Sequence, residues 1–352
     1  MIYSILLAIL LVTLVLLLAW QLLRWLPAGA DGLKPLPYVI ALLPIAPFCA
    51  ALGLIASAVA AVATRSQNEF YKSYVFLCIA YFALFVISLK SYSPYFSRRL
   101  REQTQEKSLE IRVMTLNCRY GHANASQIIK IAKTHKIDTI LLQEVSKKLV
   151  KNLEKLGIKR DFAHVQLGNA NNHENGGFNA IYTRLSNIKE SFGESIKIDA
   201  ANVPIVTAVS GDSAVAGDSS AKNLLITFAS AHPKSPMRGC AAWCSGIMSL
   251  AKIGENHNKS GCKKVTIIGG DLNSTPDHPS FRTLLKSGFL DASMQIGKRL
   301  KTWPTWQKWP NLALDHVLVK STGCSAKATE QSTIRVDGSD HFALIVCVSI
   351  LL

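Results

Sequence analysis

The stretch that decides the fold of this chain is Gly269-Gly270-Asp271-Leu272-Asn273-Ser274-Thr275-Pro276. It follows the apolar run Val265-Thr266-Ile267-Ile268, which predicts a short, fully buried strand. Two glycines at the end of that strand predict a sharp turn of the backbone. Asp271 and Asn273 are two residues apart, so in extended geometry their side chains point to the same side.

This pair of side chains has two interpretations. A carboxylate and an amide that project together from a strand end suit hydrolysis of a phosphate ester, because the carboxylate can orient or deprotonate a water while the amide holds an oxygen. The alternative is an Asx-type turn, in which both side chains bond only to the local backbone. The eight residues alone leave both interpretations open, so the rest of the chain has to decide.

Length and charge set broad limits on the function. The chain has 352 residues, enough for one large domain or two ordinary ones, and a net charge of +16. Both the apolar first part and the remainder are basic, which favours an anionic partner such as nucleic acid, anionic lipid or a phosphorylated substrate. A lysine excess that only keeps the surface soluble is an equally good explanation. The eight cysteines lack zinc-site spacing, and a disulfide in an exported domain stays open among Cys240, Cys244, Cys262 and Cys324.

Three long apolar blocks in the first ninety residues predict transmembrane helices at about 2–25, 38–63 and 74–90. Pro44 and Pro47 predict a kink early in the second block. A cleaved signal peptide is disfavoured, because no basic segment precedes the first block and that block is too long. A buried helical hairpin of a soluble protein is disfavoured by the uninterrupted apolar length.

Residues 91–110 predict a basic juxtamembrane linker, with the cluster Arg98-Arg99-Leu100-Arg101 at the lipid headgroups. Basic residues are more numerous at the end of the third block than in the loop that holds Arg65 and Lys72. The positive-inside rule therefore favours a cytoplasmic domain after the linker, although large domains are also exported against it.

Strand-like and helix-like segments alternate from residue 111 onward, which predicts an α/β fold with functional groups at strand ends. We expect helices at 126–134, with Ser126 as N-cap, and at 146–156, with Ser146 as a further cap. Five polar side chains follow or end strand-like segments: Asn117, Glu144, Arg184, His232 and Asp271. A carboxylate beside an amide at such a place suits a hard divalent cation. Alone, a glutamate there is more often a helix-start charge, and a lone histidine is usually structural.

Two segments near the end of the chain carry further candidate groups. Asp315 and His316 lie in the strand-like run 312–319, and Asp340 and His341 precede the closing strand at 342–348. A paired carboxylate fixes the tautomer of a histidine and raises its pKa, and Asp315 is placed in sequence to do this for His341. A cluster of tryptophans is either a cleft wall for a lipid or base, or simply packed in the core: Trp303, Trp306 and Trp309.

Taken in order, seven short motifs resemble the endonuclease/exonuclease/phosphatase superfamily of deoxyribonuclease I-like nucleases, neutral sphingomyelinases and inositol-polyphosphate 5-phosphatases. The motifs are 115–117, 142–144, 180–184, His232, 270–273, 315–317 and 339–341. The resemblance covers residues 111–349 and implies that residues 111–352 form one domain. It implies a four-layer α/β sandwich of two mixed β-sheets flanked by helices, with a single active site at the strand ends.

The resemblance also implies roles for individual residues. Mg²⁺ or Mn²⁺ would be held by Glu144, Asn117 and Asp340. Asp271 would orient or deprotonate the attacking water, and Asn273 would bind a phosphate oxygen. His341, paired with Asp315, would stabilise the transition state together with His232, and Arg184 belongs to one of the matching motifs. His232 departs from the abasic-site repair enzymes and favours the deoxyribonuclease and sphingomyelinase side.

These implications predict a membrane-anchored, divalent-metal-dependent phosphodiesterase or phosphatase. The three leading spans resemble bacterial proteins of the teicoplanin-resistance type, whose catalytic domain faces outward and is thought to act on polyprenyl phosphates. We therefore expect a multi-pass protein of the cell membrane with an extracytoplasmic catalytic domain, against the charge count. Alternatives are an extracellular nuclease and a non-catalytic membrane module that binds phosphorylated lipid or nucleic acid. The expected partners are the lipid bilayer and an anionic phosphorylated substrate, and no protein partner is predicted.

Overall fold

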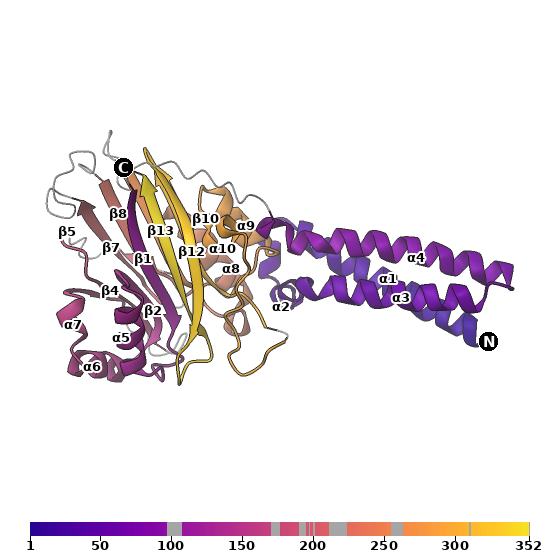
Figure 1. The fold of residues 1–352 in the computed structure, drawn as a ribbon, viewed down its shortest axis with the longest axis horizontal. Coiled ribbons are helices and arrows are strands. Elements are labelled where there is room, and N and C mark those ends of the chain that lie inside the picture. Colours follow the sequence, from indigo (N-terminus) through magenta and orange to yellow (C-terminus); the bar gives the residue numbers. More distant parts are fainter. Residues whose placement is uncertain are drawn as a thin grey trace.

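The computed structural model describes residues 1–96, 108–169, 177–189, 195–196, 198–199, 201–210, 224–254, 263–309 and 311–351. An elongated helical bundle at the N-terminus projects from an α/β domain (Figure 1). The cluster 98–101 of the predicted juxtamembrane linker lies outside the described residues, as does Cys262. Seven cysteines that the structure describes are free thiols.

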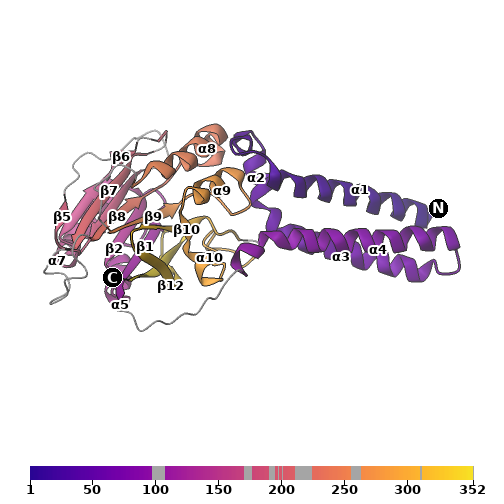
Figure 2. The ribbon, with the colours of Figure 1, turned by 90° about the horizontal axis from the view of Figure 1, so that it is seen from above.

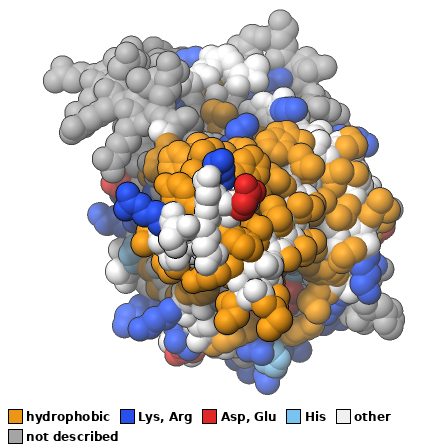
Figure 3. All heavy atoms as spheres, turned by 90° about the vertical axis from the view of Figure 1, so that its right-hand side faces the viewer, with side chains coloured by type: hydrophobic (Ala, Val, Ile, Leu, Met, Phe, Trp, Pro, Cys, Tyr) orange, Lys and Arg blue, Asp and Glu red, His pale blue; other side chains and the backbone are white. Residues whose placement is uncertain are grey.

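The bundle consists of three long helices that lie side by side in both ribbon views: α1 (Ile2–Leu22), α3 (Ala46–Ala63) and α4 (Asn68–Ser88) (Figure 2). Three segments are long and apolar enough to cross a membrane: Ile2–Trp25, Leu36–Ala63 and Asn68–Ser91. Hydrophobic side chains cover the sides of the bundle when it is viewed onto its tip (Figure 3). The length and apolar composition of these helices therefore indicate membrane association.

Helix breaks and extensions in the bundle follow local sequence. The second apolar block is divided into α2 (Leu36–Ala41) and α3 by a short 3-10 turn, Leu43–Ile45, that contains Pro44. Helix α4 begins at Asn68, six residues before the predicted apolar block at 74–90. The polar residues before that block form the first turns of the same helix. Two buried tyrosines on α4 tie it to α1: the hydroxyl of Tyr74 donates to the carbonyl of Tyr3, and that of Tyr81 to the carbonyl of Leu10.

The first sheet of the α/β domain has the strand order β12-β13-β1-β2-β4-β3. Its central strand β1 (Ser108–Asn117) is antiparallel to β13 (Phe342–Leu351) and parallel to β2 (Thr139–Val145). The remaining strands are β12 (Ser325–Arg335), β4 (Phe178–Thr183) and β3 (His164–Leu167). The mixed pairing places the C-terminal ends of β1 and β2 beside the N-terminal end of β13.

The second sheet has the order β10-β11-β9-β8-β7-β5, and β6 (Ser195–Ile196) pairs with β7 off this path. Strand β9 (Lys263–Asp271) is parallel to β8 (Leu224–Ser230) and antiparallel to β11 (Asp315–Thr322). The outer strands are β7 (Val203–Ser210), β5 (Ile188–Lys189) and β10 (Leu290–Asp291). The ends of β8 and β9 therefore meet the start of β11 at one edge.

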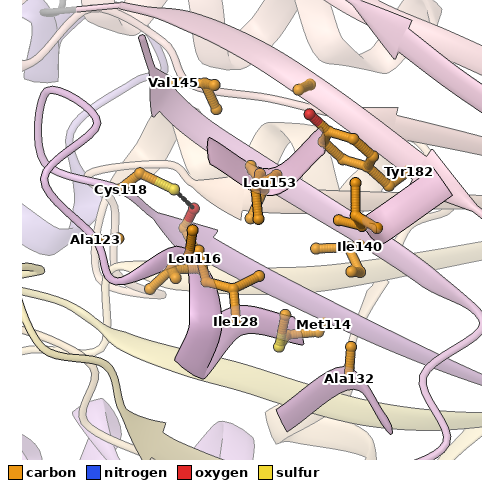
Figure 4. Close-up of a cluster of buried hydrophobic side chains, with 14 of the residues drawn as sticks. Met114, Leu116, Cys118, Ala123, Ile128, Ala132, Ile140, Val145, Leu153 and Tyr182 are labelled. Carbon is orange, nitrogen blue, oxygen red and sulfur yellow. Dashed lines mark hydrogen bonds between the residues drawn. The ribbon is translucent and has the colours of Figure 1, made fainter. Parts of the chain in front are cut away.

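Three hydrophobic cores make the domain a four-layer sandwich, as expected from the sequence. The β-branched and aliphatic residues of both sheets pack face to face in the middle. Outside the first sheet, α5 (Ala125–Thr134), α6 (Lys147–Lys155) and α7 (Ile158–Asp161) cover a second core (Figure 4). Outside the second sheet, α8 (Cys240–Ser249) and α9 (Pro279–Lys286) cover a third, and α10 (Ala292–Ile296) packs between β11 and β12.

The N-terminal caps of α5 and α6 differ in how well the sequence predicted them. Ser146 caps α6 as expected, and its hydroxyl accepts a hydrogen bond from the amide of Leu149. The cap of α5 is Asn124 and not Ser126, because the Asn124 side chain accepts from the amide of Gln127 and the helix already starts at residue 125. Asparagine and serine are equally good N-caps, so pattern alone does not choose between neighbouring candidates.

The bundle is docked on the domain through a buried polar junction. Arg24, at the end of the first candidate span, donates to the carboxylate of Asp277 at 2.9 Å and to the hydroxyl of Ser91 at 2.6 Å. His278 Nε2 lies 2.9 Å from the carbonyl oxygen of Pro37, and Asp31 accepts hydrogen bonds from Ser280. Buried hydrogen bonds between charged and polar groups favour a defined geometry, so the junction favours one relative orientation of the bundle and the domain.

Candidate active site

Asp271 lies at the centre of a group of polar side chains at the strand ends. It is the last residue of β9 and is 2% exposed. Its Oδ2 accepts a hydrogen bond from Asn117 Nδ2 at 3.0 Å, and it lies 3.5 Å from His232 Nε2 and 3.6 Å from His341 Nε2. The four side chains come from both sheets, so the two sheets meet at one polar site.

Polar contacts between the sheets fix this edge of the sandwich. The hydroxyl of Ser230, at the end of β8, donates to the carbonyl of Leu142 in β2 at 2.9 Å. The amide of Gln143 donates back to that hydroxyl at 3.0 Å. Gln143 and Ser230 are fully buried, so unpaired polar atoms would be costly there and the pairing specifies how the strand ends align.

The two glycines before Asp271 have a different role from the predicted sharp turn. Gly269 and Gly270 lie inside β9, with no positive φ among their torsions. A Cβ atom at Gly270 would collide with the backbone carbonyl of Ala231, which follows β8. Glycine is therefore needed there for close approach of two backbones, which brings His232 toward Asp271.

Asn273 departs from the extended geometry that the sequence suggested. Its φ is +49°, in the left-handed region, and its backbone N–H donates to Asp271 Oδ1 at 3.0 Å. The stretch therefore contains an Asx-type turn closed by Oδ1 of Asp271, but Asp271 does not bond only to local backbone, because its Oδ2 faces the histidines. The turn carries the half-buried Asn273 side chain out of the strand direction.

Glu144 is also held in a left-handed conformation, with a φ of +51° at an irregularity between β2 and β4. Its Oε2 accepts from the amide of Tyr120 at 2.9 Å, and its Oε1 lies 3.3 Å from Asn117 Nδ2 and 4.0 Å from His232 Nε2. A left-handed glutamate is uncommon and costs free energy, and such strain clusters at functional sites. Here it turns the carboxylate toward the site.

Asp315 and His341 form the pair that the sequence suggested. Asp315 Oδ2 lies 2.8 Å from His341 Nδ1, and both residues are buried. Burial opposes the charge of the imidazole, but the carboxylates of Asp315 and Asp271 outweigh it and raise the pKa of His341 to about 10. The same histidine lowers the pKa of Asp315, against the effect of burial on that carboxyl. The pair is therefore a carboxylate and an imidazolium at neutral pH.

The pKa of the Asp271 carboxyl is raised, whereas that of Asp315 is lowered. Burial raises the pKa of the Asp271 carboxyl, and the charge of Asp315 adds to this, although His341 and His232 oppose it. A raised pKa makes a carboxylate a stronger proton acceptor. Two carboxylates in one site thus have their pKa values moved in opposite directions, a pattern found where acid and base roles are divided.

Asp340 immediately precedes His341 and contacts the Trp303 side chain. Its Oδ2 accepts from Trp303 Nε1 at 3.3 Å, and among the described residues we find no direct contact of its carboxylate with Glu144. Ser339 connects this loop to Asn117, because its hydroxyl donates to the carbonyl of Asn117 at 2.7 Å and accepts from the amide of His341. Asp340 thus belongs to a loop that is hydrogen-bonded to the end of β1.

Arg184 lies away from this group. It follows β4, whose last residues pair with the start of β2, so it sits at the opposite end of the sheet from Glu144. Its amide donates to the carbonyl of Asp138, and its guanidinium stacks on Phe162 at 5.0 Å from the ring centroid. The structure therefore gives Arg184 a packing role, because antiparallel pairing reverses the strand end that it follows.

Two other residues near the site carried no functional signal in the sequence. Arg238 donates to the hydroxyl of Tyr120 at 2.5 Å and stacks on that ring, so a cation lies beside the residue whose amide holds Glu144.

A cleft of about 570 Å³ begins at Tyr120 and continues over the N-terminal ends of α5 and α6 toward Lys148 and Lys155. The cleft lies beside the polar group and contains none of its acidic residues, so we take the convergence on Asp271 as the site.

The donor set fits a hard cation at Glu144. Asp271, Asp315 and His341 offer atoms within 4.8 Å of one another, but His341 and Asp315 are already hydrogen-bonded to each other. Glu144 Oε1 has a long contact with Asn117 Nδ2 and lies 4.0 Å from His232 Nε2. Oxygen donors from Glu144 and Asn117 suit Mg²⁺ or Mn²⁺. As placed, the Asn117 amide oxygen accepts from the amide of Arg119, so a metal would compete with that bond.

The fold and this site define a class of protein. Two face-to-face mixed sheets carry, at one edge, carboxylates, an amide and two histidines that are suited to stabilise a phosphoryl group and to activate water. Three of these side chains, Asp271, Asp315 and His341, are buried and offer donor atoms within 4.8 Å of one another. This is the arrangement of a metal-dependent phosphoesterase.

Comparisons with known proteins identify the family. The model of the Endonuclease/Exonuclease/phosphatase family matches residues 114–341, and the chain belongs to this family. The membership confirms the superfamily expected from the motifs and supports a divalent-metal-dependent phosphoester hydrolase in general. A comparison with curated proteins finds no match.

The solved TDP2 structures have the same fold as this chain at low sequence identity. D. rerio TDP2 complexed with single strand DNA product is 18% identical with a TM-score of 0.52, covering 68% of this chain and 98% of that chain. A humanized D. rerio TDP2 is also 18% identical, with a TM-score of 0.51 and the same coverage. Sphingomyelinase C from Streptomyces griseocarneus is 14% identical with a TM-score of 0.47, covering 68% of this chain and 99% of that chain.

Proposed function

We propose that this chain is a membrane-anchored phosphoester hydrolase that uses a divalent metal and attacks phosphorus with water. The observation that carries the proposal is the convergence on one oxygen, Asp271 Oδ2, of Asn117, His232 and His341 within 3.6 Å. A module that only binds phosphorylated lipid or nucleic acid has no need for a buried carboxylate with a raised pKa among imidazoles.

Asp271 acts as the base in this proposal. Its Oδ1 is held by the amide of Asn273, which leaves Oδ2 as the atom that orients a water and accepts its proton. Burial raises the pKa of this carboxyl, which strengthens it as a proton acceptor. The Asn273 side chain, turned out of the strand, binds a phosphate oxygen.

His341 and His232 stabilise the negative charge that grows on the phosphoryl group. Asp315 fixes Nδ1 of His341 as a donor and keeps the ring charged, so that Nε2 presents a proton to the site. His232 lies 4.0 Å from Glu144 and 3.5 Å from Asp271, between the proposed metal ligand and the base. One of the two imidazoles protonates the leaving oxygen.

Glu144 holds the metal in this proposal, together with Asp340 and Asn117 from the adjoining loops. A Mg²⁺ or Mn²⁺ ion supplies charge stabilisation for the phosphoryl and leaving oxygens when it is bound. The amide of Tyr120 orients Glu144, and Ser339 ties the Asp340 loop to Asn117. The chain's own groups thus hold the acidic ligands in place before any ion binds.

The test uses the full chain in detergent, with a panel of phosphomonoesters, phosphodiesters, lipid phosphates, sphingomyelin, inositol phosphates and DNA, with and without chelator. Asp271→Asn should lower turnover of the best substrate by about 10³-fold or more, because the base is lost. The matched control is Glu330→Gln, a carboxylate on the outer strand β12 that is 71% exposed and should leave turnover unchanged. Chelator-insensitive turnover, or an active Asp271→Asn protein, would refute the proposal.

We also propose that the protein is a multi-pass protein of the cell membrane whose catalytic domain faces outward. The resemblance of the three-span anchor to the teicoplanin-resistance type supports this orientation, whereas the basic residues near the spans oppose it. Protease added to intact cells should remove the domain, while Arg65 and Lys72 at the bundle tip stay protected. Protection of the domain in intact cells and cleavage only after lysis would reverse the assignment.

A further inference from the structure

The loop between α10 and β11 carries a segment that the proposed chemistry does not use. We call residues 297–309 the tryptophan loop. It contains four basic residues, no acidic residue and three tryptophans: Lys298, Arg299, Lys301, Lys308, Trp303, Trp306 and Trp309. Trp306 is 62% exposed and Trp309 is 57% exposed. Large aromatic rings held out of the core beside cations are typical of segments that lie at a lipid headgroup layer.

The middle of the tryptophan loop borders the active site. Trp303 Nε1 donates to Asp340, and the Trp303 ring lies 6.4 Å from that of His341 between centroids. The amide of Thr305 donates to the carbonyl of Asp340 at 3.0 Å, so the loop is fixed to the site at two points. The Trp306 ring packs on Trp303 at 5.9 Å and extends this border outward.

The C-terminal end of the loop lies against the start of α3, the longer helix of the candidate span Leu36–Ala63. The Trp309 ring packs edge-on against Phe48 at 6.1 Å. Phe48 is the third residue of α3, which has 18 residues. At about 1.5 Å per residue α3 is roughly 27 Å long, close to the hydrocarbon thickness of about 30 Å. Because α3 alone nearly matches that thickness, the break at Leu43–Ile45 before it places Phe48, and with it Trp309, near the boundary of the hydrocarbon layer.

Two further features hold the tryptophan loop level with the start of α3. The Arg299 guanidinium lies 5.7 Å from the ring of Tyr92, and Tyr92 donates to the carbonyl of Pro44 just before α3. The buried pair of Arg24 and Asp277 fixes the bundle on the domain. Figure 1 shows the loop on the side of the domain that faces α2 and the start of α3. These contacts thus connect the tryptophan loop to the start of α3 as well as to the active site.

We propose that the tryptophan loop is a bilayer-contacting surface. Trp306 and Trp309 insert among the lipid headgroups, and the basic side chains of the loop face anionic lipids. Resting on the proposed function, the inference also names how substrate arrives: the site receives phosphate esters presented at the bilayer, with the apolar part of the lipid left against Trp306 and Trp309. Stacking of single-stranded nucleic acid on the same rings is disfavoured, because Trp309 packs on a residue of a membrane span.

Fluorescence quenching tests the surface without any need for catalysis. The full chain is placed in vesicles of phosphatidylcholine and phosphatidylglycerol with bromine near the ester end of the acyl chains. The double variant Trp306→Phe and Trp309→Phe should lose a large part of the bromine-quenchable emission. The control Trp243→Phe should leave that quenchable part unchanged, since Trp243 is fully buried in the domain. Equal quenching of the double variant and the wild type would overturn the proposal, as would quenching by a single-stranded oligonucleotide instead of lipid.

A ratio of activities tests the route of the substrate. Turnover is measured with phosphatidic acid in the same vesicles and with a water-soluble nitrophenyl phosphate. The double variant Trp306→Ala and Trp309→Ala should lower the ratio of lipid to soluble activity by about tenfold. This corresponds to a loss of ~1.4 kcal/mol in the free energy of binding to the bilayer surface. Leu167→Ala, an exposed apolar residue on the edge strand β3, should leave the ratio unchanged. An unchanged ratio in the double variant refutes the route. Absence of hydrolysis of both esters and of every phosphodiester in the panel described above refutes the proposed function and leaves the quenching result to judge the surface.

Discussion

Strand β11 contributes one residue to each of two carboxylate–histidine pairs, and the two pairs have different roles. Asp315 and His316 are consecutive in β11, so their side chains leave the sheet on opposite sides. Asp315 pairs with His341 at the strand-end site, whereas His316 pairs with Asp291 at 2.6 Å beneath α9. Both pairs are buried, and burial alone does not tell them apart.

The two pairs differ in what contacts the histidine nitrogen that does not face the paired carboxylate. His316 Nε2 lies 3.0 Å from the carbonyl oxygen of Ser274, so both of its nitrogens are bonded to protein groups. His341 Nε2 lies 3.6 Å from Asp271, longer than a hydrogen bond, and faces the site. A carboxylate–histidine pair is therefore available for chemistry when one ring nitrogen is left for a ligand, and structural when both are used by the fold.

The largest expected effect is on turnover. His341→Gln should lower turnover by about 10²–10⁴-fold, because a charged donor at the phosphoryl group is lost. His316→Gln, measured per folded molecule on the same substrate, should stay within about threefold of the wild type, since His316 does not reach the site. Similar losses in both variants would show that the distinction by the second nitrogen is wrong.

The next effect is on stability. Asp291→Asn should destabilise the protein by about 3 kcal/mol, because it leaves a buried imidazolium without its carboxylate. Thermal unfolding of the full chain in detergent should show a midpoint lower by about 6–12 °C. Asp315→Asn should cost less, because it also removes the repulsion between Asp315 and Asp271 that helps to raise the pKa of Asp271. The comparison fails if Asp315→Asn proves the more destabilising of the two.

A smaller effect on turnover separates a positioning residue from one that touches the substrate. Asp315→Asn should lower turnover by about 10–100-fold, less than His341→Gln, because the imidazole remains but loses its charge and orientation. The apparent pKa of His341, followed by NMR of the ring, should fall in this variant toward the ordinary value. A His341 signal that titrates as in the wild type would contradict the assignment of Asp315.

The smallest effect is a dependence of stability on pH. Burial alone would lower the pKa of His316, but the carboxylate of Asp291 reverses this and raises it above 6.5. A raised pKa in the folded state means that the stabilisation is complete below about pH 6.5 and is lost as pH rises through the folded value. The gap in midpoint between the wild type and Asp291→Asn should therefore narrow with increasing pH. A gap that widens would show that His316 is neutral in the folded protein.

Sequence patterns predicted those site residues whose position is set by the end of a single strand. Glu144, Asp271 and His341 each terminate or precede an apolar run, and ends of neighbouring strands gather at one edge of a sheet. Arg184 was wrongly grouped with them, because a pattern does not show that its strand runs antiparallel and ends at the opposite edge. The partner of His316 was missed for a similar reason, since Asp291 lies 25 residues away and no spacing rule connects them.

By itself, the sequence determined the three apolar helices, the alternation of strands and helices, and the types of side chain at the strand ends. These follow from local hydrophobic period and from the chemistry of single residues. Only the tertiary structure decided which histidine keeps a nitrogen for a ligand, that Asp271 divides its two oxygens between a turn and the site, and that the bundle is locked to the domain through Arg24 and Asp277. Those features join residues far apart in the chain, and their energies depend on burial and on distances that exist only after the sheets and the bundle have packed.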